Sequence, residues 1–210
     1  MNNYKVLISY DGTKFSGWQN QLKEKTIQGE IELVLNKIFK NKSIQLIGSG
    51  RTDSGVHAIN QVANFMIDTK MSDIQIKKAI NSYFNNEIYI NSCSKVDLKF
   101  HSRFSAVNRE YSYKISTKYS PFKRKYEWFI KHDLDIEKLL ICSDLILGQH
   151  DFSRFCKATS RKINNKCNVS ISKWDISDKT FVYSIAANRF LHHMVRLLIG
   201  TMLEVAKGRI

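Results

Sequence analysis

The order of strand-like and helix-like patterns of apolar residues along residues 1–104 is the feature that most limits the fold of this chain. Residues 5–10 alternate between apolar and polar side chains, which is typical of a half-buried strand. Residues 26–40 place their apolar side chains on one helical face. Four further segments follow, namely strands over 44–47, 56–66 and 88–96 and a helix over 72–84 that a capping box opens. The predicted order, β-α-β-β-α-β, is the ferredoxin-like arrangement that many RNA-binding sheets use.

The second half, residues 105–210, repeats most of this order without visible sequence identity. The predicted elements are a strand over 109–117, a helix over 134–147, strands over 168–176 and 181–187, and a helix over 190–206. The closing strand of the unit is absent from this series. No linker rich in Pro, Gly or Ser separates the halves. We therefore expect an α+β protein of two ferredoxin-like units, 1–104 and 105–210. We expect them to share one mainly antiparallel central sheet with helices on one side and a central cleft, as one continuous catalytic domain.

A glycine-rich stretch, residues 48–55, joins two of the predicted strands and predicts a tight turn with Asp53 at its tip. Arg51 stands two residues earlier, and a carboxylate beside a guanidinium stays ionised even when it is partly buried. An ionised carboxylate is what a catalytic nucleophile or base requires. By themselves, the residues favour the alternative of an ordinary Asp-Ser-Gly turn, in which the aspartate bonds only its own backbone.

The residues around this turn, GRTDSGVHA at 50–58, resemble the active-site motif of the TruA family of tRNA pseudouridine synthases. Further blocks resemble that family in the same order along the chain, at residues 10–19 with 26–30, 104–113, 150–152 and 190–196. The resemblance implies the pseudouridine-synthase fold and assigns the role of catalytic carboxylate to Asp53. Members of the family normally continue past the last predicted helix, so we expect either a shortened chain or another cover for that sheet edge.

The resemblance also implies roles for two residues of the second half. Tyr111 is expected to stack on the target base, although the alternating strand makes a core position the alternative interpretation. Arg196 lies on a helix that is apolar nearly all round, so we expect it to be buried and to need a partner. The resemblance implies an ion pair with Asp53, and a helix-surface arrangement with Glu204 is the local alternative. Arg51 either holds a phosphate or orients Asp53.

The amino-acid composition indicates which class of partner the protein binds. Lys and Arg exceed Asp and Glu by 33 − 19 = 14 charges, which points to a polyanion, and the basic segments 123–125 and 157–166 favour RNA backbone contact. No apolar stretch reaches membrane-spanning length and no signal peptide is visible, so a cytoplasmic protein is expected. The four cysteines have no zinc-ligand spacing and no C-x-x-C pair. We expect neither metal nor cofactor. His57 is expected to be a structural hydrogen-bonding residue.

Two functions are compatible with these features. The resemblance implies an isomerase that converts uridine to pseudouridine at positions 38–40 of the tRNA anticodon stem-loop, acting as a homodimer with the tRNA across both subunits. The alternative is a catalytically inactive RNA-binding protein with the same sheet. Composition and topology fit both, and only the combination of Asp53, Tyr111 and Arg196 favours the enzyme.

Overall fold

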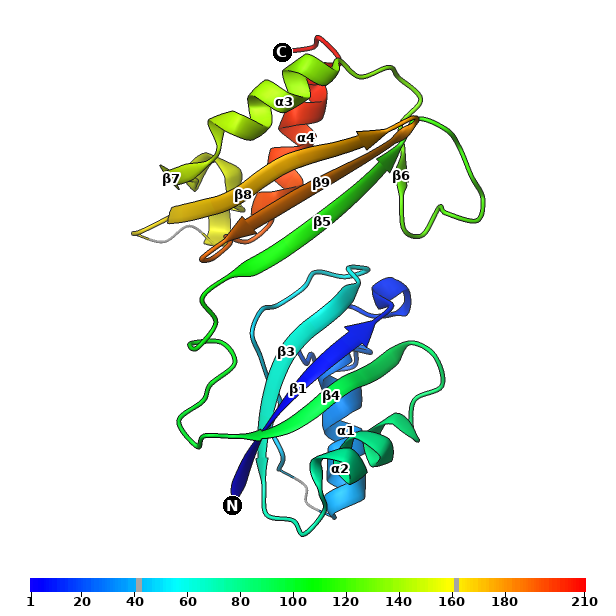
Figure 1. Cartoon of the computed structure of the whole chain (residues 1–210), viewed down its shortest axis with the longest axis vertical. Coiled ribbons are helices and arrows are strands. Elements are labelled where there is room, and N and C mark those ends of the chain that lie inside the picture. The colour runs from blue at the N-terminus through cyan, green and yellow to red at the C-terminus, as the bar shows by residue number, and fades with distance from the viewer. Residues whose placement is uncertain (41–42, 161–162) are drawn as a thin grey trace. The chain divides into compact units, whose positions relative to one another are not determined.

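The computed structural model describes residues 1–40, 43–160 and 163–210. These residues form two compact units, unit 1 (Met1–Ala106) and unit 2 (Val107–Ile210), drawn from blue to green and from green to red in Figure 1. Each unit has its own sheet, with four strands in unit 1 and five in unit 2 among the described residues. The mixed α+β class is confirmed, and one sheet shared by the two units stays a prediction. Apolar periodicity predicts which faces are buried but not which strands pair between repeated units.

Unit 1 contains the predicted elements in the predicted order. They are β1 (Asn2–Tyr10), α1 (Ile27–Phe39), β2 (Ile47–Gly48), β3 (Ala58–Ile67), α2 (Asp73–Asn81) and β4 (Ile88–Val96). The strand order in the sheet is β2-β3-β1-β4, and every neighbouring pair is antiparallel. The main difference from the prediction is β2, because Ile44 and Leu46 are buried in the core without belonging to a strand.

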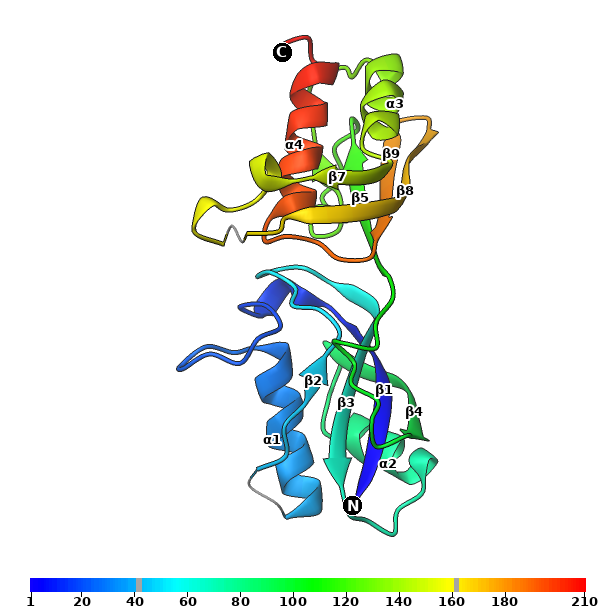
Figure 2. The same ribbon diagram turned by 90° about the vertical axis from the view of Figure 1, so that its left-hand side faces the viewer.

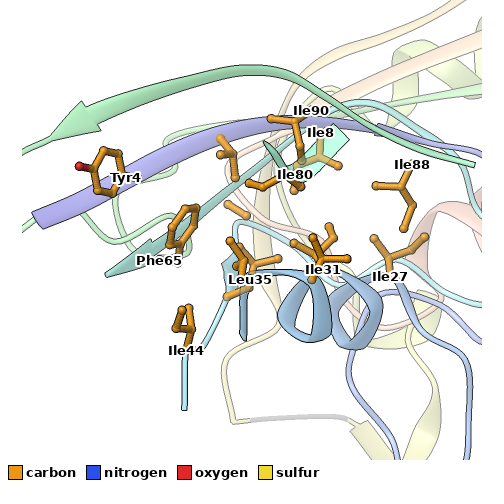
Figure 3. Packing of buried hydrophobic residues seen from close by; sticks show 14 of the residues in the cluster. Tyr4, Ile8, Ile27, Ile31, Leu35, Ile44, Phe65, Ile80, Ile88 and Ile90 are labelled. Carbon is orange, nitrogen blue, oxygen red and sulfur yellow. The ribbon is translucent and has the colours of Figure 1, made fainter. Parts of the chain in front are cut away.

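The core of unit 1 lies between the sheet and its two helices. The side chain of Thr26 caps α1 by accepting a hydrogen bond from the backbone N–H of Gly29, 3.2 Å away. Figure 3 shows Ile27, Ile31 and Leu35 on the side of α1 that faces the strands. The predicted capping box of α2 is confirmed, with Ser72 and Gln75 bonding each other's backbone N–H groups.

The opposite face of this sheet carries a buried polar network. Asn64 donates to the side-chain oxygen of Asn3 at 3.0 Å and accepts from the backbone N–H of Ser102 at 2.9 Å. Asn3 in turn donates to the carbonyl oxygens of Asp97 and Phe100, both at 2.9 Å. Because buried amides need partners, this network fixes the segment that follows β4 across the sheet.

Unit 2 contains two short strands that were not predicted. Its elements are β5 (Arg109–Ser116), β6 (Trp128–Phe129), α3 (Ile136–Leu145), β7 (Gly148–Asp151), β8 (Lys166–Ser177), β9 (Thr180–Ala187) and α4 (Met194–Ala206). The strand order is β6-β5-β9-β8-β7, and only β6 runs parallel to its neighbour. In the described part of the chain, no strand follows α4.

The helix α4 begins later than residue 190, where the prediction placed its start. His193 precedes it in the left-handed conformation, with φ of 67°, so residues before His193 cannot continue the helix. The buried side of α4 and that of α3 pack on one face of the sheet, where Leu198, Leu139 and Tyr183 belong to one core (Figure 2). None of the helices in the described residues has the length and apolar character needed to span a bilayer.

Candidate functional site

Asp53 lies in the loop of unit 1 that joins β2 to β3. Its side chain is half-buried, while Ser54 and Gly55 form an exposed turn directly after it. Gly55 has a φ of +77°, a conformation in which glycine has no steric penalty. The backbone N–H of Val56 donates to the carbonyl oxygen of Asp53 at 3.2 Å and closes the turn. The tight turn expected at this stretch is therefore present.

The loop that follows β1 holds this turn in place. The backbone N–H of Trp18 donates to the carbonyl oxygen of Thr52 at 3.0 Å, and that of Gly55 donates to the carbonyl oxygen of Phe15 at 3.3 Å. The hydroxyl groups of Tyr10 and Thr52 are hydrogen-bonded at 2.9 Å. The backbone on each side of Asp53 is thus tied to the segment 10–18, so the carboxylate is carried by an ordered framework.

Two glycines of that segment permit the close approach. A Cβ atom on Gly17 would lie 2.7 Å from the carbonyl oxygen of Thr52 and 3.2 Å from the carbonyl carbon of Asp53, and Gly17 has a φ of +92°. A Cβ atom on Gly12 would overlap the carbonyl group of Val56. Any larger residue at either position would displace the backbone of the Asp53 turn.

Trp18 supports the start of the same loop. Its side chain is only 2% exposed, and a Cβ atom on Gly48 would lie 2.6 Å from the indole ring. The indole therefore packs against the backbone at the end of β2. Gly12, Gly17 and Trp18 were not predicted as positioning residues. The only sequence signal for them was the resemblance of residues 10–19 to a family block.

His57 bonds to the loop after β1. Its Nδ1 atom lies 3.1 Å from the backbone nitrogen of Gly12 and 3.0 Å from Oδ1 of Asp11. A neutral Nδ1 accepts from the Gly12 N–H, whereas a protonated Nδ1 donates to Asp11, so the atom serves one partner at a time. Both arrangements make His57 a structural hydrogen-bonding residue, as predicted.

Arg51 does not take the position that would keep Asp53 ionised. Its side chain is exposed, and within the described residues it forms no ion pair or hydrogen bond. The described residues therefore show no ion pair between Arg51 and Asp53. Charged side chains that point into solvent avoid the desolvation that pairing would have to offset. Of the two roles left open for Arg51, this exposure favours contact with a phosphate.

Tyr111 occupies a half-buried position on β5 of unit 2. It pairs with Ile185 across the sheet and lies on the same face as Tyr113 and the buried Ile115, as the alternation predicted. Its ring meets that of Phe190 edge to face, with centroids 5.1 Å apart and an interplanar angle of 88°. Tyr111 thus packs against the core of its unit while part of its ring stays accessible.

Arg196 is exposed on α4, so the prediction that it is buried is wrong. The helix is apolar over a wide arc, but its sheet-facing side is the side of Leu198 and Met202, and Arg196 points elsewhere. Glu204, its suggested local partner, binds Lys207 at 2.9 Å and Arg209 at 3.1 Å.

A cavity of about 290 Å³ lies beside Arg196, wholly within unit 2. Burial raises the pKa of the Tyr113 hydroxyl, and the positive charge of Arg196 partly offsets that increase. The cavity therefore combines aromatic surface with a cation. Its lining residues are Tyr113, Trp128, His193, Arg196, Leu197 and Gly200. Apart from Arg196, no lining residue was predicted, because β6 and the late start of α4 bring them together.

Two further predictions concern cations and metals. The basic segment 123–125 is exposed in unit 2, whereas Arg161 and Lys162 of the segment 157–166 lie outside the described residues. The four cysteines are unpaired. Within either unit taken by itself, the described histidine, cysteine and carboxylate side chains do not gather in a group of three that could hold a metal ion.

Comparison with known proteins places the chain in a family. A family model described as tRNA pseudouridine synthase matches residues 6–105 and 143–210. The chain is 39% identical to tRNA pseudouridine synthase A 2 of Bacillus cereus and 37% identical to tRNA pseudouridine synthase A of Finegoldia magna. Each alignment covers 100% of this chain and 86% of the relative. A relative from a Bacillus species is 40% identical over 99% of this chain. The chain therefore belongs to the TruA family of tRNA pseudouridine synthases, which are isomerases.

Proposed function

We propose that this chain isomerises uridine to pseudouridine in tRNA, at positions 38–40 of the anticodon stem-loop, with Asp53 as the catalytic carboxylate. Family membership supports the reaction, and the framework around Asp53 supports the residue. The observation that carries the assignment is the framework around the turn: the Trp18 N–H bonds the Thr52 carbonyl oxygen, and a Cβ atom on Gly12 or Gly17 would collide with the backbone of the turn. An ordinary surface turn does not need two glycines of another loop packed against its backbone.

The reaction needs little beyond a positioned carboxylate. The bond from ribose C1′ to uracil N1 breaks, a bond from C1′ to C5 forms, the C5 proton leaves and N1 gains a proton. Atoms and electrons balance without an oxidant or reductant. Asp53 supplies the negative charge that is common to attack on the sugar, attack on the base and removal of a ribose proton. Its half-buried position limits its hydration while leaving it accessible to a base.

The same proposal assigns two residues of unit 2. Tyr111 stacks on the target base, which its half-exposed ring supports. Arg196 provides a cation to Asp53, as the resemblance implies, and its side chain is exposed on α4. A double-mutant cycle tests this ion pair, since Asp53→Asn and Arg196→Met must show coupled losses of unfolding free energy if the groups touch. Additive losses would show that the two side chains do not touch. Tyr111→Phe is expected to keep tRNA affinity, and Tyr111→Ala to reduce it by about 1–3 kcal/mol.

The broader arrangement follows the family. We assign both units to the ferredoxin-like arrangement, which the order β2-β3-β1-β4 of unit 1 and the neighbours β5-β9-β8 of unit 2 support. We also infer a cytoplasmic homodimer, and sedimentation of the purified chain with and without tRNA tests the oligomeric state. The net charge of +14 supports the polyanionic substrate.

Release of tritium from tRNA labelled at uridine C5 tests the proposed function. Because C5 loses its hydrogen when it bonds to C1′, each turnover transfers tritium to water. We expect release from unmodified tRNA. Tight binding of tRNA with no release would instead identify the catalytically inactive RNA-binding protein, which is the competing function.

A further inference from the structure

The segment that follows β5 and ends with β6 has an unusual surface. Residues 117–129, named here the aromatic–basic loop, contain four cationic side chains, all exposed, and a single acidic one. Among the described residues, eight aromatic side chains are more than a third exposed, and five of them belong to this loop. Figure 1 shows the loop as the green segment that extends from the β5–β6 end of the unit 2 sheet. The five are Tyr119, Phe122, Tyr126, Trp128 and Phe129.

The aromatic rings of this loop are not explained by the core of unit 2. Phe122 is 90% exposed and, in the part of the chain that the structure describes, forms no aromatic or cation–π contact. Tyr119 and Phe129 meet edge to face with centroids 5.4 Å apart, and both remain exposed. Exposing five aromatic rings to water is unfavourable for a free surface, so their clustering indicates a partner that covers them.

The loop is nevertheless folded. Lys123 pairs with Glu127 at 3.2 Å, and the backbone N–H groups of Tyr126 and Glu127 donate to the carbonyl oxygen of Lys123 at 2.8 and 2.9 Å. The backbone N–H of Ile130 donates to the carbonyl oxygen of Ser116 at 2.9 Å and closes the loop at its base. A folded loop loses less conformational entropy on binding than a disordered one, so it is suited to recognition.

We propose that the aromatic–basic loop binds unpaired nucleotides of the RNA substrate. Bases stack on Phe122 and its neighbouring rings, and Arg124 and Lys125 contact the adjoining phosphates. Single-stranded nucleic acid is bound by this combination, because every base has an aromatic face and every linkage a negative charge. Paired bases are already stacked inside a duplex and offer no such face. The inference rests on the proposed function, since it names a second contact of the same enzyme with its tRNA.

Trp128 links this loop to the cavity near Arg196. Its ring is 46% exposed, lies edge to face with that of Tyr113 at 6.3 Å, and lines the cavity together with Arg196. Trp128 therefore places one aromatic ring of the loop beside a cation on α4. A base stacked there lies close to a positive charge that can contact its phosphate, as binding of a single strand requires.

Affinity measurements with two RNA probes test the proposal. Phe122→Ala is expected to weaken binding of an anticodon stem-loop by about 5- to 150-fold, the range of one lost stacking contact. Phe122→Tyr keeps the ring and is expected to retain affinity. Leu145→Ala is the matched control, since Leu145 is 70% exposed on α3 of the same unit and lies outside the loop. Binding of a fully paired RNA duplex should not respond to Phe122→Ala.

Tryptophan fluorescence gives an independent readout of the same site. Trp18 and Trp174 are 2% and 6% exposed, so acrylamide quenches mainly Trp128. Saturating short oligouridylate is expected to protect Trp128 from acrylamide, and the duplex is not. The measurement does not depend on catalysis, so it also applies to the Asp53→Asn protein.

The possible outcomes distinguish a failure of the loop proposal from a failure of the proposed function. Unchanged stem-loop affinity of Phe122→Ala, in a protein that still releases tritium from tRNA, overturns the loop proposal alone. A wild-type protein that neither binds nor modifies tRNA overturns the proposed function. If Phe122→Ala instead dissociates a dimer in the absence of RNA, the rings belong to a contact between copies of this chain, and the RNA assignment is wrong.

Discussion

Trp18 donates its backbone N–H to the carbonyl oxygen of Thr52 over 3.0 Å, directly beside Asp53. This single bond joins two segments that are more than thirty residues apart in the sequence. The block after the first strand thus positions the block around Asp53, so residues outside the Asp53 turn help to determine where the carboxylate lies.

Gly17 is expected to be essential for catalysis but not for RNA binding. In Gly17→Ala, the added Cβ atom would meet the Thr52 carbonyl at 2.7 Å, so the Asp53 turn must shift. A displacement of about 1 Å near the reacting groups costs roughly a hundredfold in rate. Gly50→Ala is the control for folding, because a Cβ atom there meets no atom within 4 Å. Tritium release and melting temperature of both variants check the prediction. Normal turnover by Gly17→Ala would show that the framework is dispensable.

Arg51 is expected to contribute to tRNA affinity and not to stability. Because its side chain is exposed, Arg51→Gln should change the free energy of unfolding by less than about 0.5 kcal/mol. Loss of one phosphate contact should reduce the slope of log affinity against log salt by about 1. Lys78→Gln, which removes an exposed cation from α2, is the matched control. Equal salt slopes for the two variants and the parent would exclude the phosphate contact.

Breaking the buried polar network that holds the segment after β4 should lower the free energy of unfolding. Asn64→Leu removes the donor to Asn3 and the acceptor for the Ser102 N–H, and both partners are buried. Each stranded group costs about 1–3 kcal/mol. Asn60→Leu, at an exposed position of the same strand, is the control. Urea unfolding measures both. A loss below 1 kcal/mol for Asn64→Leu would mean that water replaces the missing amide.

The reactivity of the Cys93 thiol and its dependence on pH test whether this side chain is buried. Burial raises the pKa of the Cys93 thiol to about 12, so almost no thiolate forms in the folded protein at neutral pH. Alkylation of Cys93 by iodoacetamide should therefore be slow until the protein unfolds. Because the unfolded thiol ionises at lower pH, the stabilising contribution is complete below about pH 8.5 and is lost as pH rises toward 12. Fast alkylation of Cys93 in the folded protein at pH 8 would contradict this burial.

The sequence predicted the elements of unit 1 well because each carries its own local signal. The apolar face of α1 and the capping box at Ser72 need no distant partner to be recognised. The strands β6 and β7 have four residues or fewer, and β6 is defined only by its pairing with β5. The pairing of strands into sheets also depends on segments that are distant in the sequence, and the alternation of side chains within one strand does not reveal it.

The candidate site was predictable only in part. Motif resemblance indicated Asp53 as the candidate carboxylate, and alternation placed Tyr111 on the face of Ile115. The predicted burial of Arg196 is wrong because burial depends on which side of the helix meets the sheet, and the apolar pattern of α4 does not show that side. Close approaches such as that of Gly17 to the Asp53 turn depend on coordinates and leave no periodic pattern in the sequence.

The central claim is that the Asp53 carboxylate performs the isomerisation, and Asp53→Asn tests it most directly. The substitution keeps the size of the side chain and removes its charge. Tritium release from tRNA labelled at uridine C5 should fall to the level of a sample without enzyme, while tRNA affinity stays within a few-fold of the parent. Measurable release by Asp53→Asn at unchanged affinity would contradict the account, because the reaction would then proceed without the carboxylate on which the site is built.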